Sequence, residues 1–135
     1  MRLILDTGPW VALHCRDEQH HTWAKAQFAR TSEPLLTCEA VVAETCFLLA
    51  RSGFDPGKAL QLIERGVVQL AMHLNEEITT VRTLFERYDN VPVSLADACL
   101  IRMSELFEPS RVLTLDSDFR IYRRHGRKTI PLITP

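Results

Sequence analysis

The stretch RLILD (residues 2–6) places four residues of strand character directly before an aspartate, and the TGP that follows (7–9) ends the run. Such a run is too short for a buried helix and lacks helical spacing. Four more runs share this character: PLLT (34–37), VQLAM (68–72), VLTL (112–115) and TIPLI (129–133). The proline in the last run suits only an edge strand. We therefore predict five strands.

Helical patterns fill the intervals between these runs. We predict helices over 8–14, 19–30, 39–51, 56–66, 75–89, 94–107 and 117–124. The clearest is 75–89, where apolar residues from Ile78 to Tyr88 recur at spacings of three and four and Asn75 stands at the N-cap position. Alternating strands and helices predict a parallel sheet with right-handed crossovers and helices on both faces, an α/β sandwich in one domain over 1–135.

The composition is that of a globular protein. The chain has 135 residues, 46% hydrophobic and 24% charged, and no apolar run approaches the length of a membrane span. An acid at position 6 interrupts the segment that a signal peptide would keep apolar, so we expect a cytoplasmic protein without membrane contact. The four cysteines form no C-x-x-C pair, which favours reduced packing thiols.

Several acids occupy positions that have two explanations. Asp6 and Asp116 each follow a predicted strand directly. In an open parallel sheet the carboxyl ends of the strands form the edge where ligands bind. Each acid could instead cap the helix that follows it, and Ser94 with Asp97 matches a capping box. For each acid taken alone, a ligand-binding role and a helix-capping role both stay open.

Glu44 is harder to explain as a cap. It lies in the middle of CEAVVAETCFLLA (38–50) and is the only charged residue between Glu39 and Arg51. A carboxylate on so apolar a helix finds a partner, stays protonated or costs several kcal/mol, and no lysine or arginine lies within a turn of it. We therefore expect a partner from elsewhere in the fold. A lone buried glutamate with a satisfied hydrogen bond is the alternative.

Together these acids predict a cation site. Carboxylates about 5 Å apart repel by roughly 3 kcal/mol per pair at an effective dielectric near 20, so folding requires a counter-ion. Oxygen ligands without nearby histidine or cysteine select a hard ion such as Mg²⁺ or Mn²⁺.

Four segments resemble, in order and spacing, the acidic motifs of PIN domains, most closely the short VapC-type toxins: LILDTGPWVAL (3–13), VVAETCFLL (41–49), VSLADACLI (93–101) and VLTLDSDF (112–119). The resemblance implies strand order 3-2-1-4-5 and a Mg²⁺- or Mn²⁺-dependent ribonuclease that leaves a 5′-phosphate. It also implies a homodimer and a cognate antitoxin protein as partners. The site residues it implies are the catalytic and metal-binding quartet Asp6, Glu44, Asp97 and Asp116, a further metal ligand Asp118, and supporting hydroxyls on Thr7 and Thr114.

A basic segment, RIYRRHGRK (120–128), follows the last acidic motif. One interpretation is a solvated helix face. The other is that Arg120, Arg123 and Arg124 contact RNA phosphates, or the acidic tail of a partner. A nuclease that is not a toxin also stays open within the PIN-domain resemblance. Two further classes stay open beside it: a non-catalytic module that binds RNA or protein, and a phosphatase of the haloacid dehalogenase type. The phosphatase requires an acid two residues after the first, where this chain has Gly8.

Overall fold

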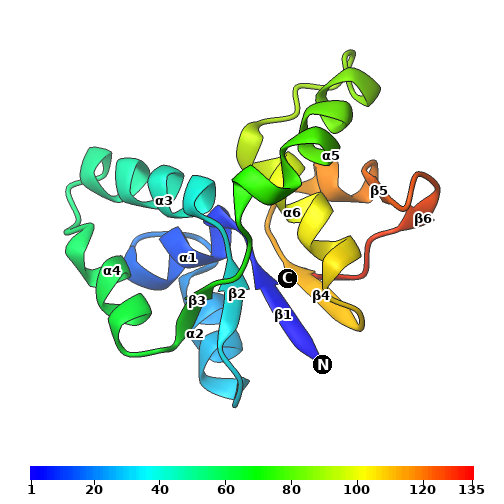
Figure 1. Cartoon of the computed structure of the whole chain (residues 1–135). Helices are drawn as coiled ribbons and strands as arrows, with labels where there is room; N and C mark the ends of the chain where they lie inside the picture. Colours follow the sequence, from blue (N-terminus) through cyan, green and yellow to red (C-terminus); the bar gives the residue numbers. More distant parts are fainter.

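Five parallel strands form the central sheet of the computed structural model, which describes residues 1–135 (Figure 1). They are β1 (Arg2–Leu5), β2 (Leu35–Thr37), β3 (Val68–Leu70), β4 (Ser110–Leu113) and β7 (Leu132–Ile133), in the order β3-β2-β1-β4-β7. The predicted α/β fold and strand order are confirmed, because β7 is the fifth strand expected near Pro131 and lies at an edge.

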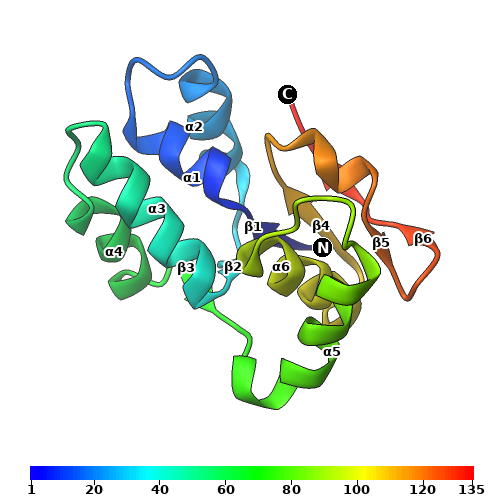
Figure 2. The same cartoon turned by 90° about the horizontal axis from the view of Figure 1, so that it is seen from above.

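Helices cover both faces of this sheet (Figures 1 and 2). One layer contains α1 (Thr7–His14), α2 (His21–Arg30), α3 (Glu39–Arg51) and α4 (Gly57–Glu64), and the other contains α5 (Leu74–Arg87) and α6 (Leu95–Leu106). The division follows from the strand order: the chain moves from β1 to β3 in one direction and then returns across the sheet to β4. Right-handed crossovers in opposite directions place their helices on opposite faces.

One apolar core of 26 buried residues joins the two layers through the sheet. Ile4 and Leu5 of β1 are fully buried, as are Trp10 on α1, Leu49 on α3 and Met103 on α6. The four cysteines are free, and three of them are buried. None of the helices has the length and apolar character that crossing a membrane requires.

The helix predicted over 117–124 is wrong. A four-residue 3₁₀ turn, η1 (Ser117–Arg120), is followed by the antiparallel hairpin of β5 (Arg123–Arg124) and β6 (Lys128–Thr129), drawn in orange to red in Figure 1. His125 and Gly126 adopt φ values of 51° and 79°, which form a tight turn that an α-helix does not contain. The N-cap prediction for Asn75 is also wrong, because α5 begins at Leu74 and His73 is its N-cap.

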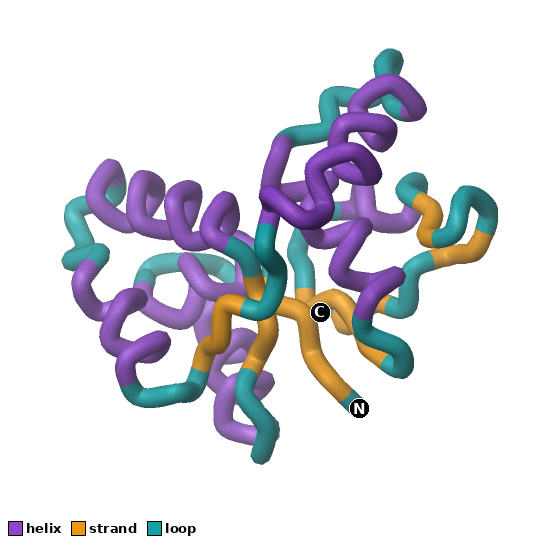
Figure 3. Tube along the Cα trace, viewed as in Figure 1, coloured by secondary structure: helices purple, strands orange, loops and turns teal.

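The topology creates a crevice between β1 and β4, whose continuations diverge at their carboxyl ends. β1 leads into α1 on one face, whereas β4 leads through η1 to the hairpin beside α6. Figure 3 shows the strands in orange between the two groups of helices in purple. Gly8 allows the first turn of α1 to approach the segment after β4, since a Cβ at this position would lie 3.1 Å from the Cβ of Leu115. This crevice is where a parallel sheet accommodates ligands.

Candidate active site at the carboxyl edge of the sheet

The crevice contains a hollow of about 430 Å³ that we call the acidic hollow. Four acids line it: Asp6 at the end of β1, Glu44 on α3, Asp97 in the first turn of α6 and Asp116 after β4. The other lining residues are Thr7, Gly8, Leu48, Ser94 and Leu115. The structure thus brings together the four acids that the sequence motifs indicated, from elements spread over most of the chain.

Asp6 lies at the bottom of the acidic hollow and is 6% exposed. Its Oδ1 accepts a hydrogen bond from the backbone N–H of Thr7 (2.7 Å), and its Oδ2 accepts one from the Thr114 hydroxyl (2.6 Å). Burial raises the pKa of Asp6 to about 6, and repulsion from Asp97 and Asp116 adds to the rise that these two hydrogen bonds oppose. Asp6 therefore caps α1 and also belongs to the hollow, so the two explanations were not exclusive.

Thr114 connects the first acid to the last. Its side chain is fully buried, and its Oγ1 accepts a hydrogen bond from the N–H of Asp116 (2.9 Å) while donating to Asp6. Asp116 in turn caps η1, since its Oδ1 accepts from the N–H of Asp118 (2.9 Å). The relative position of β1 and the loop after β4 is fixed by this chain of hydrogen bonds.

Asp97 completes a capping box with Ser94, as its position in the sequence suggested. Its N–H donates to the Ser94 hydroxyl (3.0 Å), and its Oδ2 accepts from the Ser94 N–H (3.2 Å). The same Oδ2 accepts a hydrogen bond from the hydroxyl of Tyr122 (3.2 Å). Burial, followed by repulsion from Asp116, raises the pKa of Asp97 above the ordinary aspartate value.

Tyr122 is a site neighbour that the sequence analysis missed. It lies 25 positions from Asp97 in a basic segment, and no local motif marks it. Burial and the charge of Asp97 raise the pKa of its phenol, so the hydroxyl remains a hydrogen-bond donor.

Glu44 lies at the open side of the acidic hollow, which rules out the alternative of a lone buried glutamate. The residue is exposed, and its Oε2 accepts a hydrogen bond from the Thr7 hydroxyl (3.0 Å). The helix packs against the core through Val41, Thr45 and Leu49, one residue per turn, and leaves the rest of its apolar surface open. Phe47 on that surface is 64% exposed.

The acids fit a hard cation in their chemistry, although they do not form a closed ligand cage. No lysine, arginine or histidine forms an ion pair with any of the four. The donor set of carboxylate and hydroxyl oxygens suits Mg²⁺ or Mn²⁺. No group of three or more His, Cys, Asp or Glu side chains, however, is close enough together to count as a preformed metal site. Asp97 and Asp116 add to the raised pKa of Asp6, and no ion pair offsets their charge.

Other residues indicated by the sequence lie outside the acidic hollow. Asp118 is not among the lining residues. Arg124 forms an ion pair with Glu108 (2.6 Å), and its side chain is 17% exposed near the C-terminal end of α6. Arg123 directs Nη1 to the backbone carbonyls of residues 120–122, whereas Arg120 is exposed and donates to the Thr134 hydroxyl (3.3 Å). Of the three arginines, Arg120 is the most available to a ligand.

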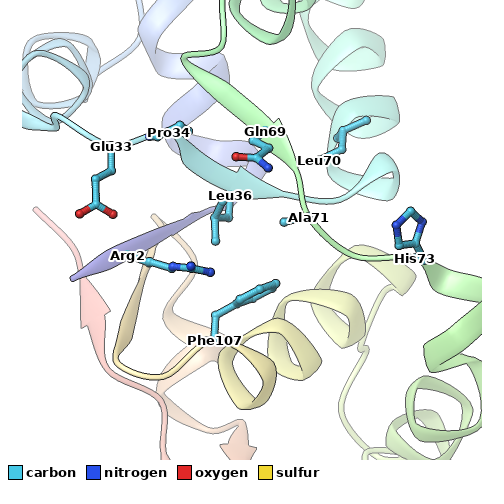
Figure 4. Close-up of a pocket in the computed structure, with 9 residues that line it drawn as sticks. All are labelled: Arg2, Glu33, Pro34, Leu36, Gln69, Leu70, Ala71, His73 and Phe107. Atoms are coloured by element: carbon cyan, nitrogen blue, oxygen red, sulfur yellow. The ribbon is translucent and has the colours of Figure 1, made fainter.

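A second hollow, of about 380 Å³, lies between the β2–β3 half of the sheet and the end of α6 (Figure 4). The Arg2 guanidinium lies 5.4 Å from the centre of the Phe107 ring, and Glu33 and His73 stand on opposite sides of the opening. The second hollow contains none of the four acids. The acidic hollow is therefore the stronger candidate for chemistry.

Comparison with known proteins assigns the class. The family model described as "PIN domain" matches residues 3–124, and the chain belongs to the PIN-domain family. It is similar to Ribonuclease VapC26 of Mycobacterium tuberculosis (strain ATCC 25618 / H37Rv), with 26% identity over 132 residues that cover 96% of this chain and 93% of that protein. Its fold is similar to the crystal structure of M. tuberculosis VapC20, described as a sarcin-ricin loop cleaving toxin, with a TM-score of 0.80 and 21% identity over 96% of this chain and 99% of that one. The predicted resemblance to PIN domains and VapC ribonucleases is confirmed.

Proposed function

We propose that this protein is a divalent-metal-dependent ribonuclease that hydrolyses RNA phosphodiester bonds at the acidic hollow. The observation that carries the proposal is the convergence of Asp6, Glu44, Asp97 and Asp116, from four distant elements, on one hollow in which no cationic side chain balances them. Membership of the PIN-domain family and similarity to a VapC ribonuclease support a nuclease over the other classes. The absence of an acid at Gly8 argues against the phosphatase.

Each acid has a role that follows from its position. When bound, Mg²⁺ or Mn²⁺ supplies the positive charge that a phosphodiester needs before a nucleophile can approach it. Asp6 and Asp97, whose carboxylates each accept two hydrogen bonds, are the proposed principal ligands. Glu44 and Asp116 complete the set and orient or deprotonate the attacking water. Thr7 and Thr114 keep Glu44 and Asp6 in place through their hydroxyls.

The biological setting that we propose is that of a toxin in a toxin–antitoxin pair. It rests on the similarity to VapC26, a ribonuclease, and to VapC20, a toxin. A cognate antitoxin, a homodimer and a cytoplasmic location are parts of the same proposal. An adjacent short reading frame encoding a DNA-binding segment with a disordered tail would support the antitoxin, and light scattering of the purified chain would establish the number of subunits.

The direct test is cleavage of labelled RNA with Mg²⁺, with and without a chelator, by the wild type, Asp6→Asn and the control Asp89→Asn. Asp89 is exposed and makes no side-chain hydrogen bond, so its variant changes the net charge without touching the hollow. We expect the chelator and Asp6→Asn to abolish cleavage and Asp89→Asn to retain it. The substrates should include a sarcin-ricin stem-loop, because VapC20 is described as cleaving it. Cleavage that survives both treatments would rule out the four-acid mechanism.

Two other outcomes would identify a different class. Phosphate release from small esters without RNA cleavage would favour a phosphatase. RNA retention on a filter without cleavage of any substrate would favour a non-catalytic RNA-binding module.

The basic segment can be tested by the salt dependence of RNA binding. Each lost phosphate contact reduces the slope of log K against log salt by about one. We expect Arg120→Gln to flatten the slope, because this side chain is exposed and belongs to the last residue of η1. Arg124→Gln is the matched control, since its guanidinium is already paired with Glu108 and is expected to leave the slope unchanged. Equal slopes for the wild type and Arg120→Gln would show that Arg120 does not contact RNA phosphates.

A further inference from the structure

Tyr122 is held rigidly beside the acidic hollow. It is fully buried, and its ring packs edge-to-face against Tyr88 and Phe119, with centroid distances of 5.2 Å in both pairs. Its backbone N–H donates to the carbonyl of Asp118 (3.1 Å), which fixes the start of the segment after η1. Because both ring and backbone are fixed, the hydroxyl has one defined position.

The hydroxyl of Tyr122 meets one specific oxygen of the hollow. It donates to Oδ2 of Asp97, which already accepts from the N–H of Ser94. Oδ1 of Asp97 accepts no hydrogen bond from any residue of the chain. The two donors therefore occupy one carboxylate oxygen and leave the other available.

We propose that Tyr122 is a positioning residue that sets the orientation of the Asp97 carboxylate and directs Oδ1 to the divalent ion. This inference rests on the proposed function, because it assigns a task at the same metal site. Without the phenol, Asp97 would keep only the capping bond from Ser94 and could rotate about its Cβ–Cγ bond. Groups that hydrogen-bond to metal ligands in this way commonly change metal affinity by 10–100-fold.

A purely structural role is the alternative, and Tyr88 provides the control for it. Tyr88 belongs to the same aromatic cluster, and its hydroxyl accepts from the N–H of Arg123 (2.8 Å) without touching an acid. Tyr88→Phe and Tyr122→Phe each remove one buried hydroxyl and keep the ring. Both variants should lose stability by similar amounts, but only Tyr122→Phe should affect the metal.

The experiment is titration of the full chain with Mn²⁺ by calorimetry, without RNA, for the wild type and the two variants. We expect Tyr122→Phe to bind about tenfold more weakly and Tyr88→Phe to remain within about twofold of the wild type. In an Asp97→Asn background, Tyr122→Phe should cause no further loss, because the tyrosine acts through Asp97. Equal affinities for the wild type and Tyr122→Phe, or a loss that persists in the Asp97→Asn background, would overturn the assignment. A wild type that binds no Mn²⁺ would overturn the proposed function as well as the role of Tyr122. A wild type that binds Mn²⁺ with the same affinity as Tyr122→Phe would overturn only the role of Tyr122, so the two failures can be told apart.

A second measurement avoids any loss of folding in Tyr122→Phe. The chain has two tyrosines, so 3-fluorotyrosine incorporated into Tyr88→Phe labels Tyr122 alone. We expect its ¹⁹F resonance to shift on addition of Mg²⁺ and to stay in place in the Asp97→Asn chain. If the ¹⁹F resonance of Tyr122 does not shift on addition of Mg²⁺ in the chain that retains Asp97, the proposal is contradicted.

Discussion

Replacing Asp6 by asparagine is expected to stabilise the protein in the absence of divalent ions. Burial and two neighbouring acids raise the pKa of Asp6 from 3.8 to about 6. At about 1.36 kcal/mol per pKa unit, holding this carboxylate ionised in the folded state costs about 3 kcal/mol at neutral pH. Asparagine still accepts the hydrogen bond from Thr7, but the Thr114 hydroxyl loses its acceptor, which costs about 1 kcal/mol. The net gain is about 2 kcal/mol.

The sign of the pH dependence follows from the direction of the shift. Protonated Asp6 contributes stability that is fully present below the unfolded pKa of 3.8 and is lost as pH rises through about 6. Asp6→Asn has no such loss, so its advantage should be absent near pH 4 and complete above pH 7. For a chain of 135 residues, 2 kcal/mol corresponds to about 7 °C in Tm at about 2.1 cal/mol/K per residue.

The assay is thermal and urea unfolding of both proteins between pH 4 and pH 8 in chelator, repeated with Mg²⁺. Mg²⁺ at 100 times its Kd should stabilise the wild type by about 2.7 kcal/mol and leave Asp6→Asn unchanged. Asp89→Asn serves again as the control for net charge. Lower stability of Asp6→Asn at pH 7.5 in chelator, or a stability difference that does not vary with pH, would refute the argument that uncompensated charge strains the hollow.

Four further variants test separate features. Thr114→Val should lower the free energy of unfolding by about 1–3 kcal/mol, because it removes a fully buried hydroxyl that bridges two acids, and should weaken Mn²⁺ binding in a calorimetric titration. Arg102→Ala should lower the free energy of unfolding in urea by about 1–2 kcal/mol, since its guanidinium donates hydrogen bonds to acids on both α5 and α6. An unchanged urea midpoint would show that this link between the two helices is weak. Phe47→Ala should change stability by less than about 0.5 kcal/mol, because the ring is 64% exposed, whereas fully buried Leu49→Ala should lose about 2–5 kcal/mol in the same assay.

The strands could be predicted because their signal is local. Each is a short apolar run that ends at a turn or capping residue, and burial on both faces of a parallel sheet produces this pattern. The alternation of strand and helix then determined the class of fold, while the strand order came from resemblance to PIN domains. The acid that follows β1 and the acid that follows β4 could be placed at one edge for the same topological reason.

The errors arose where contacts between distant residues decide the structure. The segment 117–124 has no local feature that excludes a helix, but the pairing of β5 with β6 and the bond from the Arg123 N–H to Tyr88 hold it extended. A buried Glu44 stayed open as an alternative because its neighbours in the sequence are apolar, but α3 leaves part of that apolar surface exposed. Tyr122 reaches Asp97 only through the tertiary fold, so no pattern of spacing could have revealed it.

The central position of β1 also determines when a newly made chain could become active. β1 pairs with β2 on one side and with β4 on the other, and β4 carries the loop that delivers Asp116. A nascent chain that has assembled β1, β2 and β3 therefore still lacks two of its four acids and one whole wall of the hollow. If the proposed nuclease acts as described, the chain gains its activity only after β4 and Asp116 have been synthesised and have docked beside β1.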